Sequence, residues 1–211
     1  MDHSDHVGLI RGGLANAGPR WLELGAGEGA FTLALADVVG PGAEITALDR
    51  DSRSLRRLAQ DVARRFPDGS LATVVADFRE ALPAGPFDGV LAANSLHFVP
   101  DAVAILAAAR EVLVPGGRLV IVEYDADRGN PWVPHPFSAE RFAVLADAAG
   151  FVGPREIGRV PSRFLGAIYA ALAWNPADPN RTDGFVAGRL TAEDASVPVL
   201  HSRPHGGDRE Q

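Results

Sequence analysis

The sequence has no cysteine and no lysine among its 211 residues. Without cysteine there are no disulfide bonds, thiolate metal sites or thiol nucleophiles. All 20 basic residues are arginines, so the chain lacks a lysine for a Schiff base and the lysine of a Walker A phosphate loop. No apolar stretch is long enough to cross a bilayer, and the N-terminus lacks the apolar run of a signal peptide. We therefore expect a cytoplasmic protein without membrane insertion.

A surplus of positive charge is also missing, because the formal net charge is -7. This balance argues against a nucleic-acid partner, since binding to phosphates requires a basic surface. No histidine cluster has the spacing of a closed metal site, and the sequence contains no G-x-S-x-G motif, which would indicate a serine nucleophile. With 46% hydrophobic and 22% charged residues, the composition is that of an ordinary globular domain, and we expect a small-molecule partner.

Short apolar runs alternate with helical patterns along the chain. The runs, which we interpret as strands, are 21–25, 44–49, 71–77, 87–94 and 118–124. The helical patterns are 29–39, 52–66, 101–113 and 138–149, with serine caps expected at Ser52 and Ser138. Continuous apolar runs are typical of parallel strands covered on both faces. The alternation predicts an α/β fold with a doubly wound, Rossmann-like sheet.

Two further strands are expected at 151–160 and 163–173, joined only by Pro161 and Ser162. So short a link permits a hairpin but no parallel crossover, so we predict a seven-stranded sheet whose last strand is antiparallel. We assign one domain to residues 1–174. Residues 175–211, rich in Pro, Asp, Gly, Arg and His, are expected to form a disordered tail with a short helix near Ala192. The pattern carries no signal for an oligomeric state.

The segment from Glu23 to Gly29 follows the first strand and opens a helix. Its glycines let the backbone turn sharply close to a ligand, and the helix N-terminus offers free N–H groups. Asp49 ends the second strand, where its two oxygens can accept both hydroxyls of a ribose. Asp77 ends the third strand and is followed by Phe78. The carboxylate of Asp77 can accept from the exocyclic amine of a base, while the ring of Phe78 lies on that base. The alternatives are a purely structural turn and a helix-capping role for Asp49 or Asp77.

Two ligand classes fit this turn. The pattern G-x-G-x-x-A, ending at Ala30, is compatible with a nicotinamide or flavin dinucleotide and hence with an NAD(P)-dependent oxidoreductase. Glu23, two residues before the first glycine, favours S-adenosylmethionine. Its carboxylate can bind a cationic amine, whereas a negatively charged pyrophosphate offers it no partner. The expected hairpin after the last crossover favours S-adenosylmethionine too.

The ordered motifs ELGAGEG, ITALDRD, VVADF, FDGVLAANSLHFVPD and LVPGGRLVIVEYD resemble those of class I S-adenosylmethionine-dependent methyltransferases. The resemblance is to the small methyltransferase-domain group that includes the ubiquinone/menaquinone-biosynthesis type, and it covers roughly residues 6–173. It implies a set of cofactor contacts at the strand ends: Glu23 and Asn94 at the methionine part, Gly25, Ala26 and Gly27 along the turn, Asp49 at the ribose, and Arg50, Asp77 and Phe78 at the adenine.

The resemblance also implies methyl transfer to a small-molecule acceptor, unless the chain is a non-catalytic relative that only binds the cofactor. If the acceptor must lose a proton, His97 is the first candidate base, since histidine side chains titrate near neutral pH. Tyr124 and His135 are the other candidates, and packing is the alternative role for His97. Fewer than twenty residues precede the first strand, so the lid is short or lies elsewhere, with 125–137 as the candidate. The alternative is a crossover loop whose Trp132 fills the core.

Overall fold

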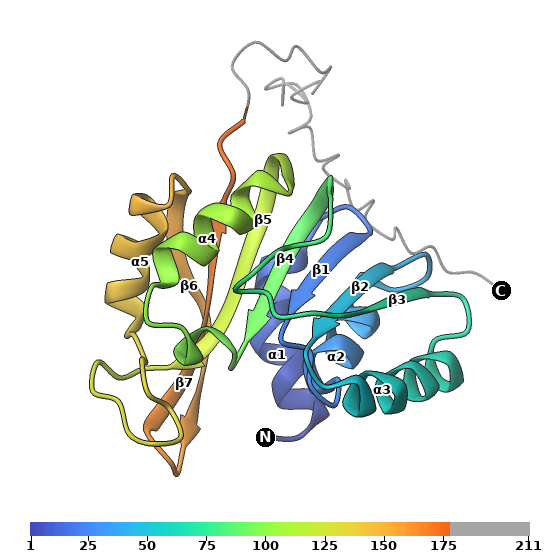
Figure 1. Ribbon diagram of the computed structural model, residues 1–211, viewed down its shortest axis with the longest axis horizontal. Coiled ribbons are helices and arrows are strands. Elements are labelled where there is room, and N and C mark those ends of the chain that lie inside the picture. The colour runs from blue at the N-terminus through green and yellow to red at the C-terminus, as the bar shows by residue number, and fades with distance from the viewer. Residues whose placement is uncertain (178–211) are drawn as a thin grey trace, which may run out of the picture. The chain divides into compact units, whose positions relative to one another are not determined.

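Seven strands form one mixed sheet in the computed structural model, which describes residues 1–177 (Figure 1). The strands are β1 (Arg20–Leu24), β2 (Glu44–Asp49), β3 (Ser70–Val75), β4 (Phe87–Ala93), β5 (Leu113–Tyr124), β6 (Val152–Ser162) and β7 (Gly166–Trp174). Their order in the sheet is β3-β2-β1-β4-β5-β7-β6. The pairs among β1 to β5 are parallel, whereas β7 runs antiparallel to both β5 and β6. The predicted doubly wound sheet with an antiparallel last strand is confirmed.

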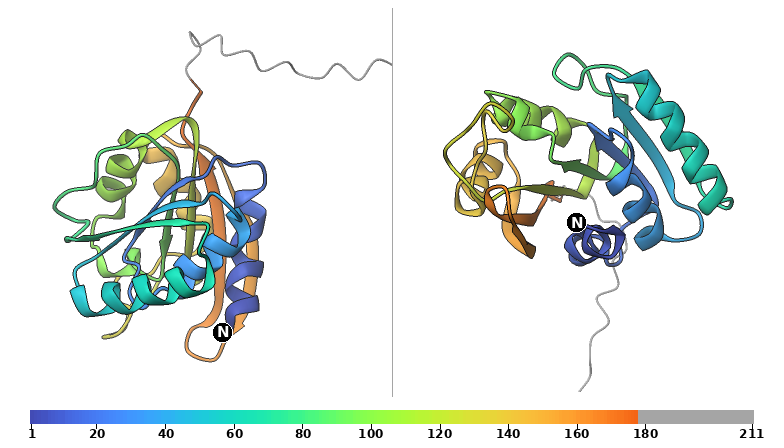
Figure 2. Two further views of the ribbon diagram at one scale, coloured as in Figure 1. Left: turned by 90° about the vertical axis from the view of Figure 1, so that its right-hand side faces the viewer. Right: turned by 90° about the horizontal axis from the view of Figure 1, so that it is seen from below.

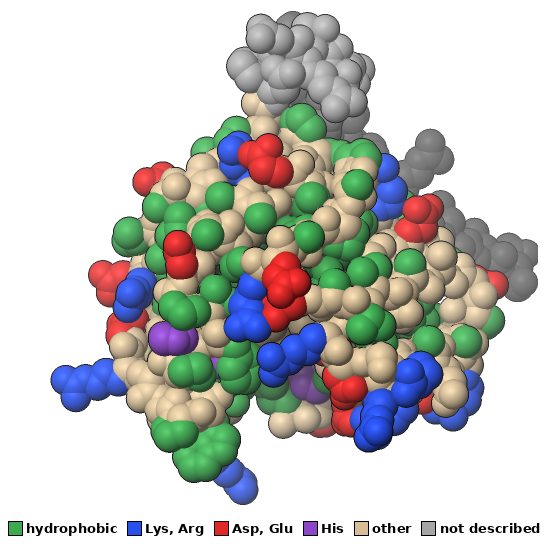
Figure 3. Space-filling view, in the orientation of Figure 1, with side chains coloured by type: hydrophobic (Ala, Val, Ile, Leu, Met, Phe, Trp, Pro, Cys, Tyr) green, Lys and Arg blue, Asp and Glu red, His purple; other side chains and the backbone are tan. Residues whose placement is uncertain are grey.

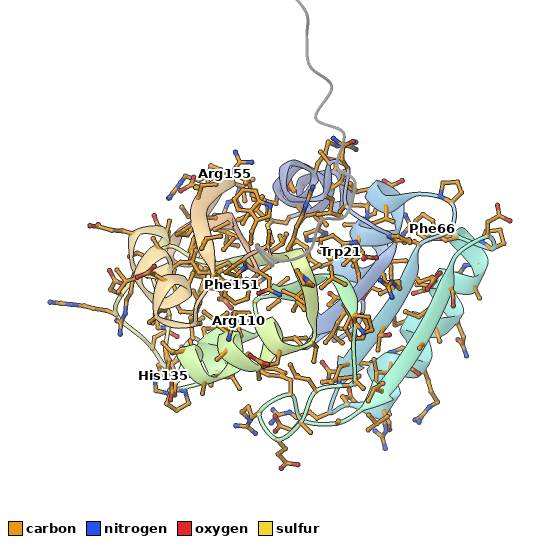
Figure 4. All side chains as sticks on the ribbon, turned by 90° about the horizontal axis from the view of Figure 1, so that it is seen from above. Trp21, Phe66, Arg110, His135, Phe151 and Arg155 are labelled. Atoms are coloured by element: carbon orange, nitrogen blue, oxygen red, sulfur yellow. The ribbon has the colours of Figure 1, made fainter. Side chains whose placement is uncertain are left out.

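Helices cover both faces of this sheet (Figure 2). They are α1 (His3–Leu14), α2 (Ala30–Val39), α3 (Ser52–Arg65), α4 (Ala102–Glu111) and α5 (Ala139–Ala148), with a short 3-10 helix η1 (Leu96–Phe98). Side chains on one face, with Trp21 among them, pack against α1 and α2. Those on the other face, with Phe151 nearby, pack against α4 and α5. Figure 4 shows these two side chains on opposite sides of the sheet.

The strand order reverses between β1 and β4, because β2 and β3 lie on one side of β1 while β4 and β5 continue on the other. In open α/β sheets a crevice forms at such a switch point, outside the carboxyl ends of the strands. The fold therefore brings Asp49, Asn94 and the turn after Leu24 to one edge, although they are far apart in the sequence.

Several local expectations need correction. The N-terminal residues form α1, capped by Asp2, which the sequence pattern did not predict. Asp51, and not Ser52, caps α3, because its carboxylate accepts from the Arg53 N–H at 2.9 Å. The cap at Ser138 is confirmed.

The hairpin and the sheet edge also differ from expectation. Strand β6 extends further than predicted and β7 starts later and is shorter, so the turn lies at residues 163–165, where Ser162 pairs with Gly166. The edge strand β3 is largely exposed, so its apolar sequence does not reflect burial on both faces. Among residues 1–177 no helix is both long and apolar enough to cross a membrane. The expected tail and the helix near Ala192 lie in 178–211, outside the described residues.

Candidate active site

The turn after β1 is built on glycine geometry. Gly25, Gly27 and Gly29 have φ values of 76°, 54° and 89°, a region that favours glycine. A Cβ added at Gly25 would lie 2.6 Å from the Ser95 Cβ, whereas one at Gly27 would meet nothing within 4 Å. The backbone must therefore pass close to the β4 segment at Gly25, while at Gly27 it faces open space where a ligand can approach.

Asp49 fixes this turn from the end of β2. Its Oδ2 accepts from the Gly27 N–H at 2.8 Å, and its Oδ1 accepts from the Asp51 N–H at 2.8 Å. Each carboxylate oxygen has a second lone pair, so both can still accept a hydroxyl. The capping alternative is only partly met, because Asp49 binds the N-cap residue of α3 and leaves the cap itself to Asp51.

Glu23 lies behind the turn and not in the cavity described below. Its side chain is 2% exposed and accepts a hydrogen bond from the Thr32 hydroxyl on α2. Burial raises the pKa of Glu23 to about 8, and the nearby charge of Asp49 acts in the same direction. The hydrogen bond from Thr32 acts in the opposite direction on this pKa, because it stabilises the carboxylate. The expected contact of Glu23 with the methionine part stays a prediction.

A cavity of about 440 Å³ opens at the carboxyl ends of β1 to β4. That volume falls within the range of small-molecule and cofactor sites. Seven residues predicted from the sequence line it: Gly25, Gly27, Asp49, Arg50, Asp77, Phe78 and Asn94. Ala76, Arg79, Ser95 and Phe98 complete the lining, whereas the predicted residues Glu23, Ala26 and His97 lie outside it.

Asp77 and Arg79 form an ion pair at one end of this cavity. Hydrogen bonds from the Arg79 guanidinium, and secondly from the Arg79 backbone N–H, lower the pKa of Asp77 to about 2. Asp77 is therefore ionised at neutral pH and available as an acceptor beside Phe78. Arg79 was missed by the sequence reasoning, although its position two residues after Asp77 permits this local pairing.

Asn94 occupies a strained position where β4 ends. It has φ 51°, and its backbone N–H donates to the Val122 carbonyl at 2.8 Å. Its side-chain Oδ1 is buried and accepts no hydrogen bond from the described residues. Ser95 anchors the same segment by donating to the Leu24 carbonyl at 2.7 Å. A buried acceptor at the cavity wall suits a ligand that brings a donor, such as an ammonium group.

His97 is paired with Glu123 on β5, a residue that the sequence reasoning did not select. The Nδ1 of His97 lies 2.7 Å from Glu123 Oε2, and the two side chains are 3% and 0% exposed. The other oxygen, Oε1, accepts from the backbone N–H groups of Leu96 at 2.9 Å and His97 at 3.3 Å. A charged residue inside the apolar run 118–124 was the signal in the sequence, because buried carboxylates require partners.

Aromatic rings continue outward from His97. Their centroids are 6.0 Å apart between His97 and Tyr124, 5.7 Å between Tyr124 and Phe164, and 6.3 Å between Phe164 and Trp132. Phe98, which lines the cavity, lies 4.3 Å from the His97 ring. We call Tyr124, Phe164 and Trp132 the aromatic wall. In Figure 3, hydrophobic side chains gather over the tip of the β6–β7 hairpin, which carries Phe164.

The segment 125–137 contributes Trp132 to this wall. Trp132 is 71% exposed, so the alternative in which it fills the core is wrong. The buried residues of this segment are Val133, Pro136 and Phe137. His135 lies at the outer edge (Figure 4), where it lines a second, smaller hollow and donates its backbone N–H to the His97 carbonyl at 2.9 Å. Within residues 1–177 no group of His, Asp and Glu side chains could hold a metal ion.

Comparison with known proteins shows what this chain is similar to. A family model described as "Methyltransferase domain" matches residues 22–121, just under half of the chain. The chain is similar to methyltransferases over this part. It is 30% identical over 180 residues to nocamycin O-methyltransferase of Saccharothrix syringae, covering 83% of the chain and 62% of that protein. It is 29% identical over 129 residues to a ubiquinone/menaquinone biosynthesis C-methyltransferase of Ectopseudomonas mendocina, covering 61% of the chain and 50% of that protein.

A solved structure shows the same fold as this chain. The N-methyltransferase NodS from Bradyrhizobium japonicum, in complex with S-adenosyl-L-homocysteine, matches with a TM-score of 0.65 and 24% identity, over 82% of this chain and 86% of that one. The chain spans less than two thirds of the two curated relatives named above. The family match contains the glycine turn, Asp49, Asn94 and His97 but ends before Glu123 and the aromatic wall.

Proposed function

We propose that this protein binds S-adenosylmethionine in the cavity at the carboxyl ends of β1 to β4 and transfers its methyl group to a small-molecule acceptor. The single observation that carries the proposal is the convergence of Gly27, Asp49, Asp77 and Asn94 on one cavity of about 440 Å³. The family match and the small-molecule methyltransferases among the relatives support it. They favour this function over a dinucleotide-dependent oxidoreductase. The cytoplasmic location and the absence of a nucleic-acid partner stay predictions from the sequence.

The residues of the cavity fit such a ligand. Asp49 would accept the ribose hydroxyls through its remaining lone pairs, and Phe78 would lie against the adenine with Asp77 accepting from its amine. The unpartnered Oδ1 of Asn94 would accept from the ammonium of the methionine part. Gly27 leaves the backbone open to the ligand. The cofactor supplies an electrophilic methyl group on a sulfonium, and the protein supplies position and electrostatics.

His97 is our candidate for the group that removes a proton from the acceptor. Tyr124 is a weaker candidate, because burial and then the charge of Glu123 raise its pKa above the ordinary phenol value, which keeps its hydroxyl protonated at neutral pH. His135 is separated from the cavity and lines the smaller hollow instead. The aromatic wall and the segment 125–137 would cover the acceptor side.

Calorimetric titration with S-adenosylmethionine and S-adenosylhomocysteine, with NAD and NADP in parallel, tests the proposal. We expect binding of the two adenosyl compounds and no signal from the nicotinamides. Asp49→Ala should weaken S-adenosylhomocysteine binding on the order of 100-fold, because it removes hydrogen bonds from two hydroxyls to a charged acceptor. The control Asp61→Ala removes an exposed carboxylate on α3 and should leave the affinity unchanged. Because Asp49 also holds the turn, unfolding of both variants is measured alongside.

Binding of the nicotinamides alone would overturn the proposal in favour of an oxidoreductase. Binding of the adenosyl compounds without methyl transfer to any small hydroxyl, amine or carbon acceptor would favour the non-catalytic alternative.

A further inference from the structure

We propose that Glu123 is a positioning residue that holds His97 with its Nε2 as a free proton acceptor, and that this pair selects a planar, apolar acceptor bearing a hydroxyl group. The inference rests on the proposed function, because it concerns the acceptor side of the same site. It joins two observations that the cofactor contacts do not use: the buried His97–Glu123 pair and the aromatic wall that leads outward from it.

The hydrogen bonds of Glu123 determine which nitrogen of His97 carries the proton. Two backbone N–H groups, those of Leu96 and His97, already donate to Glu123 Oε1. An ionised carboxylate only accepts hydrogen bonds, so Oε2 requires a donor at Nδ1. In a neutral imidazole with Nδ1–H, the other nitrogen, Nε2, is an acceptor.

The position of Nε2 suits a proton acceptor at the edge of the cavity. Within residues 1–177 Nδ1 of His97 is held by Glu123, whereas Nε2 has no hydrogen-bond partner. The His97 side chain is 3% exposed, so a methyl acceptor reaches Nε2 from the cavity side and not from open solvent. Phe98 links His97 to the cavity, because its ring lies against the imidazole and lines the cavity wall.

The aromatic wall indicates the shape of the molecule that would reach Nε2. Phe164 and Trp132 are 49% and 71% exposed, which leaves large apolar faces in solvent beside the site. Flat ring systems pack well against such faces in offset or edge-to-face arrangements. Arg159 near the hairpin does not enter this wall, since it is paired with Asp125 and Glu156. A ring resting on the wall with its hydroxyl toward His97 satisfies both features.

Methyl transfer and proton transfer both take place at the hydroxyl oxygen of the acceptor. This oxygen forms a bond to the methyl carbon while the methyl–sulfur bond breaks, and the sulfur keeps that electron pair. The hydroxyl proton passes to Nε2 of His97, and the imidazolium is stabilised by the carboxylate of Glu123. An acceptor without an acidic proton would leave Nε2 unused.

The first test is the tautomer of His97, read by long-range ¹H–¹⁵N NMR on histidine-labelled protein saturated with S-adenosylhomocysteine, with His97→Asn to assign the signals. We expect the neutral Nδ1–H form in the wild type. Glu123→Gln should reverse it to Nε2–H, because the new amide oxygen stays on the two backbone N–H groups and the NH₂ group then donates to Nδ1. The exposed Glu111→Gln on α4 is the matched control and should change nothing.

The second test uses 2-naphthol and its methyl ether, 2-methoxynaphthalene, as probes on the same complex. The wild type should bind the hydroxyl compound about two- to tenfold more tightly, the value of one net hydrogen bond. Glu123→Gln should lose this preference, whereas Phe164→Ala should weaken both probes alike.

A wild-type His97 that is protonated at Nε2, or equal affinity of the wild type for the two probes, would overturn the inference, and the comparison of the two probes needs no variant. Preference for 2-naphthol that persists in Glu123→Gln would overturn the role of Glu123. Because S-adenosylhomocysteine binding is measured separately, its absence would count against the proposed function alone.

Discussion

Replacement of Glu23 by glutamine should change how the stability of the protein depends on pH. The carboxyl group is 2% exposed, and burial raises its pKa from an ordinary 4.5 to about 8. Between these two values the folded state holds a proton that the unfolded chain has released. Folding stability from this group is therefore fully present below pH 4.5 and is lost as the pH rises toward about 8.

The magnitude follows from the two pKa values. In that window the unfolded state binds one proton fewer, so the free energy of unfolding falls by about 1.4 kcal/mol per pH unit. Between pH 5 and pH 8 the total is on the order of 4 kcal/mol, which is a large part of the stability of a typical domain. In the Glu23→Gln variant the amide would carry no charge at any pH and would keep an oxygen for the Thr32 hydroxyl.

Urea unfolding of the wild type and Glu23→Gln at several pH values across this window measures the effect. The variant should gain stability relative to the wild type as the pH rises. Glu28→Gln is the matched control: it lies on the exposed side of the turn, where its ion pair with Arg57 contributes little. If the stability difference between Glu23→Gln and the wild type is the same at every pH, the burial argument for Glu23 is refuted.

Four further substitutions test the geometry of the site. Gly25→Ala should destabilise the protein by about 2–4 kcal/mol in urea unfolding, from left-handed strain and a steric clash, whereas Gly27→Ala should cost only about 1 kcal/mol; equal losses would contradict the close approach at Gly25. Arg79→Ala should tighten S-adenosylhomocysteine binding about two- to fivefold in calorimetry, because Asp77 no longer exchanges a salt bridge for the ligand; weaker binding would show that the arginine itself contacts the ligand. Trp132→Ala should change the unfolding free energy by less than about 0.5 kcal/mol while weakening 2-naphthol binding, and a large stability loss would restore the core-filling alternative.

The inner strands could be predicted because burial on both faces leaves continuous apolar runs in the sequence. Helix α1 could not, since Gly8, Gly12 and Gly13 interrupt its pattern and lower its intrinsic helix propensity. The structure explains Gly13: a Cβ there would lie 2.8 Å from a Val120 methyl and 2.9 Å from an Ile157 methyl. Tertiary packing against the sheet, and not local preference, therefore determines this helix.

The cofactor side of the site could be predicted for a different reason. Carboxyl ends of parallel strands meet at one edge, so Asp49, Asp77 and Asn94 converge once the strands are known. Glu123 and Phe164 were not predicted as site residues, because their roles depend on partners that sequence spacing does not reveal. Glu123 reaches across to the segment after β4, and Phe164 comes from a hairpin turn whose position was predicted wrongly.

The end of β5 joins the two halves of the site. Val122 accepts the Asn94 N–H on the cofactor side, and the next residue, Glu123, holds both the backbone of Leu96 and the ring of His97 on the acceptor side. The carboxylate therefore has two separable roles: its Oε2 sets the tautomer of His97, and its Oε1 accepts from two buried backbone N–H groups. A substitution that keeps the oxygen, such as glutamine, alters the first role only. A substitution that removes both oxygens also leaves two buried donors unpaired, at a cost of about 1–3 kcal/mol each, and loosens the segment that carries Asn94. If Glu123→Ala loses cofactor affinity and Glu123→Gln keeps it, the structural role of Glu123 is separate from its role in setting the tautomer of His97.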